Sequence, residues 1–207
     1  ASLVESADYA LSNYRLYAAM PPILDFVDQL TNWYIRLNRR RFWAGNTSEE
    51  LEDKFNAYAT LHKVLLTFVR VLAPLAPFIS EEIFRNLAQG VSGLEPESVH
   101  LNPFPKLSEL KGAEIQPELE QAMDLFEEII LLGRNVRNAH GLKVRQPLAL
   151  LTIIYPDVQV IERIKMLDGY IRDELNVKKI EYTTDEVKYV SLRAQLNTKA
   201  LGSVLGP

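Results

Sequence analysis

The sequence predicts a mainly α fold, with a helical bundle over residues 1–147 followed by a small α/β domain over residues 148–207. Apolar residues recur at steps of three or four through most of the first range, which is typical of amphipathic helices. Prolines and glycines stand where these repeats break, so they indicate the helix ends. From Leu148 the pattern changes to an apolar, β-branched run that predicts a strand.

Composition limits the possible functions. A chain of 207 residues, 47% hydrophobic and 24% charged, can bury a sizeable core. The net charge of −4 argues against a general nucleic-acid coat, so any nucleic-acid surface must be local. The absence of cysteine excludes disulfides and thiolate zinc sites and allows a reducing compartment. No apolar run reaches membrane length. Because the sequence starts inside a helical pattern, we expect a fragment of a longer protein.

Two helices are expected in the first part of the bundle. The first covers about residues 3–19, and we expect Pro21 and Pro22 to end it, because proline lacks the N–H that a helix interior needs and disfavours helix in the preceding residue. The second covers about residues 23–43, with an apolar stripe from Ile23 to Leu37.

The next two helices carry clear end signals. Thr47 and Glu50 form a capping-box pattern that opens a third helix, which runs to Pro74. Pro77 opens a fourth helix that lasts to about Gln89. The predicted buried face of the third helix consists of Leu51, Phe55, Tyr58, His62, Leu65, Leu66, Val69 and Leu72.

The remaining chain is expected to hold one loop, one long helix and the α/β domain. Residues 91–112 predict a surface loop, and Pro117 opens a fifth helix to about residue 138. Gly169 is a candidate break in the helix of the α/β domain. That domain is expected as a β-α-β-β-α unit, with elements at about 148–155, 158–175, 177–182, 187–194 and 197–204.

The most informative stretch for function is residues 32–43, which hold four arginines, two tryptophans, a tyrosine and two asparagines. At helical spacing a second stripe, polar and cationic, is formed by Asn32, Arg36, Arg39 or Arg40, and Trp43. Arginine pairs bidentately with phosphate and stacks on bases, and aromatic rings give bases a platform. Composition alone leaves two interpretations equally open, nucleic-acid contact and a plain solvated face.

Several motifs in this chain resemble one family. Asn32-Trp33-Tyr34-x-Arg36, followed by Arg41-Phe42-Trp43, resembles the signature helix of the anticodon-binding domain of class Ia aminoacyl-tRNA synthetases, most closely the isoleucyl type, with the valyl and leucyl types as relatives. Phe104 replaces a tryptophan that is usual in this family. Further matches in the family's order lie at residues 72–83, 98–105, 134–148, 170–178 and 201–206.

The resemblance implies that the fragment binds the anticodon stem of tRNA(Ile) and belongs to a chain that also carries a catalytic domain. Candidate tRNA-binding residues of the first patch are Asn32, Trp33, Arg36, Arg39, Arg40, Arg41 and Trp43. Those of the second patch are Arg134, Arg137, Lys143 and Arg145. An alternative function for the motif is structural: the helix would be packed and oriented by Asn32, Trp33 and Tyr34. Alternatively, the cations of the second patch stabilise the C-terminal end of the fifth helix through their interaction with the helix dipole.

Catalytic residues are expected to lie outside this fragment. The family's two phosphate-binding signatures, a His-x-Gly-His turn and a Lys-Met-Ser-Lys-Ser loop, are absent, as is a glycine-rich phosphate cradle. The resemblance therefore implies no catalytic residue and no cofactor here, although the parent enzyme would use ATP and Mg²⁺. His62, His100 and His140 lack the ligand spacing of a metal site.

We expect a cytoplasmic monomer without membrane contact. The alternatives are a valyl- or leucyl-type fragment, or a helical protein–protein module whose Arg and Trp residues are interface hot spots. A free-standing enzyme would require a pocket with convergent titratable groups.

Overall fold

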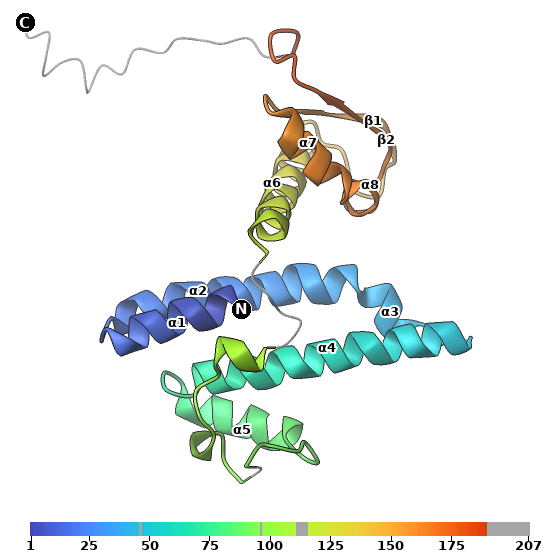
Figure 1. The fold of residues 1–207 in the computed structure, drawn as a ribbon. Coiled ribbons are helices and arrows are strands. Elements are labelled where there is room, and N and C mark those ends of the chain that lie inside the picture. Colours follow the sequence, from blue (N-terminus) through green and yellow to red (C-terminus); the bar gives the residue numbers. More distant parts are fainter. Residues whose placement is uncertain (46, 96, 111–115, 190–207) are drawn as a thin grey trace, which may run out of the picture. The chain divides into compact units, whose positions relative to one another are not determined.

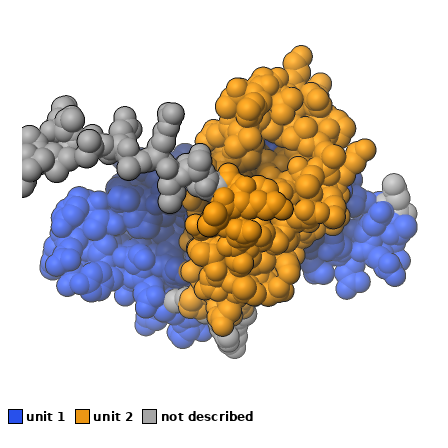
Figure 2. Space-filling model, turned by 90° about the horizontal axis from the view of Figure 1, so that it is seen from above, with its two compact units in different colours: residues 1–115 blue, residues 116–207 orange. Residues whose placement is uncertain are grey.

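The computed structural model describes residues 1–45, 47–95, 97–110 and 116–189. The chain forms two compact units, residues 1–115 and 116–207, which are coloured separately in Figure 2. Helices dominate and the strands are confined to the second unit, so the predicted fold class, mainly α with a small α/β part, is confirmed. No helix in the described ranges combines the length and hydropathy needed to cross a bilayer.

Unit 1 is a helical bundle (Figure 1) in which α1 packs beside α2 and α5 packs beside α4. Its elements are α1 (Ser2–Ser12), α2 (Leu16–Gln29), the π-helix η1 (Leu30–Ile35), α3 (Arg39–Trp43), α4 (Ser48–Leu72), α5 (Pro77–Leu87) and the short 3-10 helices η2 (Val99–Leu101) and η3 (Leu107–Glu109). Ile23 of α2, Val69 and Val71 of α4, Phe84 of α5 and Val99 of η2 are almost completely buried. Each such side chain stabilises the fold by roughly 1.5–3 kcal/mol through burial.

The first two helices differ from the prediction. Helix α1 ends at Ser12, because Tyr14 adopts a left-handed φ of 56° and the chain reverses there. Pro21 and Pro22 lie inside α2 instead of ending α1. The Pro21 ring removes a hydrogen bond to the carbonyl of Tyr17, whose residue is exposed, so water can satisfy that carbonyl. The predicted helix over 23–43 is likewise divided into α2, η1 and α3.

Helix α4 begins as predicted. The Glu50 N–H donates to Thr47 Oγ1 at 3.2 Å and the Thr47 N–H donates to Glu50 Oε2 at 3.1 Å, which confirms the capping box. Its predicted buried face is only half right. From Leu66 onward α4 enters the core, whereas Leu51, Phe55 and Tyr58 are exposed, because α4 extends past the core cluster at its N-terminal end.

The loop after α5 is fixed to the bundle by a carboxylate. Glu81 Oε2 accepts hydrogen bonds from Ser98 Oγ and from the Val99 N–H, both at 2.9 Å. The Val99 backbone bond, followed by bonds from Ser98 and Arg85, lowers the pKa of Glu81. Val99 itself fills the core. Ser98 and Val99 therefore hold the loop on the bundle.

Unit 2 consists of a two-stranded sheet, the two helices that connect its strands, and a long helix packed on those two helices (Figure 1). Its elements are α6 (Pro117–Ala139), β1 (Leu148–Ile154), α7 (Val158–Lys165), α8 (Asp168–Leu175) and β2 (Val177–Thr183). The strands are parallel, with Leu148 opposite Val177 and Ile153 opposite Tyr182. The helix expected over 158–175 is two helices, with the break at Met166 and Leu167, whereas Gly169, the candidate break, lies in the first turn of α8.

Contacts assign α6 to the second unit, because it packs on α7 and α8. The compact units therefore divide after residue 115, whereas the sequence predicts a domain boundary at residue 147. The boundary at residue 147 stays a prediction. Residues 187–189 of the expected third strand form a turn, and the rest of that strand and the expected last helix lie outside the described residues.

Candidate nucleic-acid interface

The Asn-Trp-Tyr motif lies in the π-helix η1, where the wider turn changes which side chains face the bundle. Trp33 is only 7% exposed, whereas Asn32 lies at the surface. The Tyr34 hydroxyl donates to the Ala57 carbonyl of α4 at 3.4 Å, and its ring meets Phe42 edge-on with centroids 6.5 Å apart. The alternative interpretation of this motif, packing and orientation, therefore fits Trp33 and Tyr34.

Arg41 attaches α3 to α4. Its Nε and Nη2 donate to the two carboxylate oxygens of Asp53 at 2.8 and 2.6 Å, and its Nη1 donates to Asn38 Oδ1 at 2.8 Å. The Arg41 hydrogen bond lowers the pKa of the Asp53 carboxyl. A bidentate pair fixes geometry as well as charge. Arg41 therefore positions α3, and its guanidinium is directed at α4.

Helix α3 presents cations and a tryptophan to solvent. The Arg39 guanidinium carbon lies 5.1 Å from the centre of the Trp43 ring, and Trp43 is 73% exposed. Arg36 and Arg40 are also exposed. A cation held over an exposed indole keeps the ring in one orientation, although such a contact contributes only about 0.5–1 kcal/mol. Among the candidates of the first patch, the exposed residues are Asn32, Arg36, Arg39, Arg40 and Trp43, and their contact with RNA stays a prediction.

Sequence reasoning missed the exposed aromatics of α4. Phe55 is 71% exposed and Tyr58 is 50% exposed, on the half of α4 that packs against α3. The Tyr58 ring lies 5.0 Å from the buried Phe42 ring, so one of its sides is held by α3. No signal in the sequence marks this exposure, because Phe55 and Tyr58 lie on the regular apolar stripe of the helix and only the tertiary fold shows where the core cluster ends.

The second patch is smaller than predicted. Arg137 is 2% exposed, and Nη1 and Nη2 donate to backbone carbonyls within the protein. Arg134 is half-buried and pairs with Glu174 at 2.6 Å. Only Lys143 and Arg145 point their charges into solvent. The expectation that Arg137 faces RNA is therefore wrong, because its donors are already used; the RNA contact of Lys143 and Arg145 stays a prediction.

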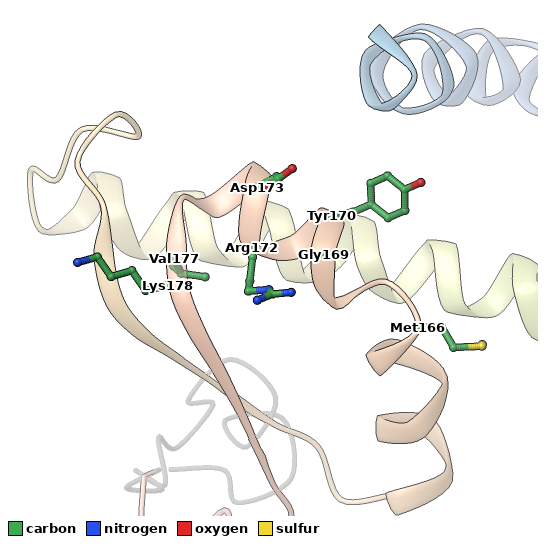
Figure 3. Close-up of a pocket in the computed structure, with 7 residues that line it drawn as sticks. All are labelled: Met166, Gly169, Tyr170, Arg172, Asp173, Val177 and Lys178. Atoms are coloured by element: carbon green, nitrogen blue, oxygen red, sulfur yellow. The ribbon is translucent and has the colours of Figure 1, made fainter. Parts of the chain in front are cut away.

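A cavity of about 540 Å³ opens on unit 2 between α7, α8 and β2. Figure 3 shows that the side chains of Lys178 and Tyr170 at its edge extend away from one another. Arg172 pairs with Asp168 at 3.0 Å. The titratable groups do not converge as they would in an active site. Within the described ranges, no cluster of three or more His, Asp or Glu side chains could hold a metal ion.

Fold and surface together define a helical module with a local cationic and aromatic edge on an acidic chain. Comparison with known proteins then identifies the family. The family described as the anticodon-binding domain of tRNA ligase matches residues 1–154, and the chain belongs to this family.

Three relatives that match almost the whole chain are isoleucine–tRNA ligases. The chain is 39% identical over 205 residues to the isoleucine–tRNA ligase of Bdellovibrio bacteriovorus and 40% identical over 204 residues to that of Protochlamydia amoebophila. It is 42% identical over 210 residues to that of Clostridium tetani. Each match covers 99% of this chain but 19% of the relative, so the chain spans about a fifth of the relatives' length.

Proposed function

We propose that this chain is the tRNA-binding region of an isoleucine–tRNA ligase and holds the anticodon end of tRNA(Ile) while aminoacylation takes place elsewhere in the protein. The observation that carries the proposal is the Arg39–Trp43 pair, exposed on α3 in a domain of the anticodon-binding family. Isoleucine is favoured over valine and leucine because the relatives are named isoleucine–tRNA ligase.

The proposed interface divides its contacts by chemistry. Arg36, Arg39 and Arg40 are exposed cations that suit phosphate, which positions an RNA without reading its sequence. Trp43 and Phe55 are exposed rings that suit unpaired bases, because single-stranded loops are recognised by stacking. The first turn of α4 is acidic, so phosphate contacts are expected on α3 and not at the start of α4, whereas base contacts are expected at Trp43 of α3 and Phe55 of α4.

The remaining features of the proposal concern the whole protein. Its partner would be tRNA(Ile), and the chain would act as a monomer attached to a catalytic domain in the cytoplasm. ATP and Mg²⁺ would be bound by that catalytic domain, where they supply the activation of the amino acid. In this chain Lys143 and Arg145 would add a second, smaller cationic contact.

The test is the salt dependence of tRNA(Ile) binding in a filter assay. Each phosphate contact contributes about 0.7–0.9 to the slope of log K against log salt. Arg39→Ala with Arg40→Ala should therefore weaken binding and reduce the slope by roughly 1.4–1.8. The control is Arg15→Ala with Lys106→Ala, which removes two exposed cations away from α3.

Competition completes the experiment. Unlabelled tRNA(Ile) should displace the probe at lower concentration than leucine or valine tRNA. An unchanged slope for the α3 variant would remove Arg39 and Arg40 from the interface. Weak association that all polyanions share would favour the protein–protein module instead.

A further inference from the structure

The loop between α6 and β1 has four consecutive carbonyls bound by two side chains. Arg137 Nη1 donates to the carbonyls of Lys143 and Gln146 at 2.9 and 3.0 Å. Asn176 Nδ2 donates to the carbonyls of Val144 and Arg145 at 3.2 and 3.0 Å. Residues 143–146 are therefore held at every carbonyl, which is unusual for a surface loop whose carbonyls water could satisfy.

The two side chains come from different elements, and Arg137 also binds the backbone carbonyl of Asn176. Arg137 Nη2 donates to the carbonyls of Leu175 and Asn176 at 2.5 and 3.2 Å, which joins α6 to the end of α8. Asn176 adopts a left-handed conformation, with φ 48° and ψ 57°, a region that asparagine tolerates better than most residues. Its carbonyl accepts from the Leu148 N–H at 3.0 Å, where the parallel sheet begins. We call Arg137 and Asn176 the loop clamp.

The clamp determines what the loop presents. Because the carbonyls turn toward Arg137 and Asn176, the side chains of Lys143 and Arg145 turn outward and are exposed. Arg137 is buried, and its hydrogen bonds go to carbonyls, so no carboxylate among these partners neutralises its charge. Its positive charge adds to the field of the two exposed cations above it.

We propose that Arg137 and Asn176 are positioning residues that hold residues 143–146 in a shape ready for phosphate, with Lys143 and Arg145 as the contacting groups. The inference rests on the proposed tRNA-binding function. A loop that is already ordered loses little conformational freedom when it binds. For comparison, ordering one flexible side chain on binding lowers the affinity roughly 2- to 12-fold.

Four variants of the whole chain test this proposal. Asn176→Gly removes the amide but keeps the left-handed backbone, and should weaken tRNA(Ile) binding by roughly 2- to 12-fold with an unchanged salt slope. Val144→Gly, at an exposed loop position, loosens the loop with the clamp intact and should act in the same direction. Lys143→Ala with Arg145→Ala should reduce the slope by roughly 1.4–1.8. Lys106→Ala, a cation in unit 1, is the charge control.

Trypsin provides an independent readout, because it cleaves after Lys143 and Arg145. Cleavage there, followed by mass spectrometry, should be slow in the wild type and faster in both glycine variants. Absence of tRNA binding by the wild type would defeat the proposed function itself. Wild-type binding together with glycine variants that are cleaved faster yet bind equally well would overturn the clamp proposal alone. A wild-type slope in the Lys143 and Arg145 double variant would overturn it as well.

Discussion

Gly133→Ala tests the packing of α6 on α8. At Gly133 an added Cβ would lie 2.6 Å from Leu175 Cδ1 and 2.8 Å from Cδ2, whereas carbon atoms in good contact are about 3.5–4.0 Å apart. Leu175 is fully buried and cannot turn into solvent to make room. Overpacking of this kind costs about 1–3 kcal/mol. Alanine favours the helix over glycine by up to about 1 kcal/mol, so we expect the free energy of unfolding to fall by roughly 1 kcal/mol in total.

The assay is urea unfolding followed by far-UV circular dichroism, within a double-mutant cycle. Leu175→Ala alone should cost about 2–5 kcal/mol, because it leaves a cavity. In the Gly133→Ala background that cost should fall by roughly 1–3 kcal/mol, because the shortened side chain no longer meets the new methyl group. Gly169→Ala is the matched control, since a Cβ there meets nothing within 4 Å. If Gly133→Ala stabilised the protein as much as Gly169→Ala, the close approach of α6 and α8 would be refuted.

Two further predictions concern unit 1. Hydrogen bonds from Val99, Ser98 and Arg85 lower the pKa of Glu81, so its contribution to stability is present above the unfolded value of about 4.3 and is lost as the pH falls through the folded value. Glu81→Gln should therefore show a shallower loss of melting temperature between pH 5 and pH 3 than the wild type, and an equal loss would contradict the assignment. Thr47→Ala should cost about 1 kcal/mol in urea unfolding because it removes the N-cap, while Thr47→Ser should keep most of the stability.

Features with a local cause could be predicted from the sequence. The capping box at Thr47, the start of α5 at Pro77 and the start of α6 at Pro117 depend on backbone groups within one turn, and all three agree with the structure. The strands at Leu148 and Val177 follow from β-branched runs. Pro21 and Pro22 lie inside α2 instead of ending a helix, and the carbonyl that Pro21 leaves without a helical partner belongs to Tyr17, an exposed residue.

Side chains whose partners are distant in sequence could not be placed in this way. Arg137 bonds to carbonyls 38 and 39 residues away, and Arg134 pairs with a carboxylate 40 residues away. Periodicity places both on α6, but only the tertiary fold brings α8 over them. The exposure of Phe55 has the same origin, since it depends on where the core cluster ends and not on the residues around it.

Each patch holds an arginine that is bound to the protein, Arg41 or Arg137, and an exposed arginine, Arg39 or Arg145. Arg41 is held by Asp53 and fixes the segment from which Arg39 projects, as Arg137 holds the loop from which Arg145 projects. A flexible arginine loses side-chain entropy when it binds, so a neighbour that fixes the backbone beneath it reduces that cost without adding a contact. Because the chain has a net charge of −4, the proposed affinity for RNA cannot come from total charge and would depend on how well a few cations are placed. Replacement of a bound arginine should therefore weaken RNA binding through geometry, whereas replacement of an exposed one should act through the salt slope.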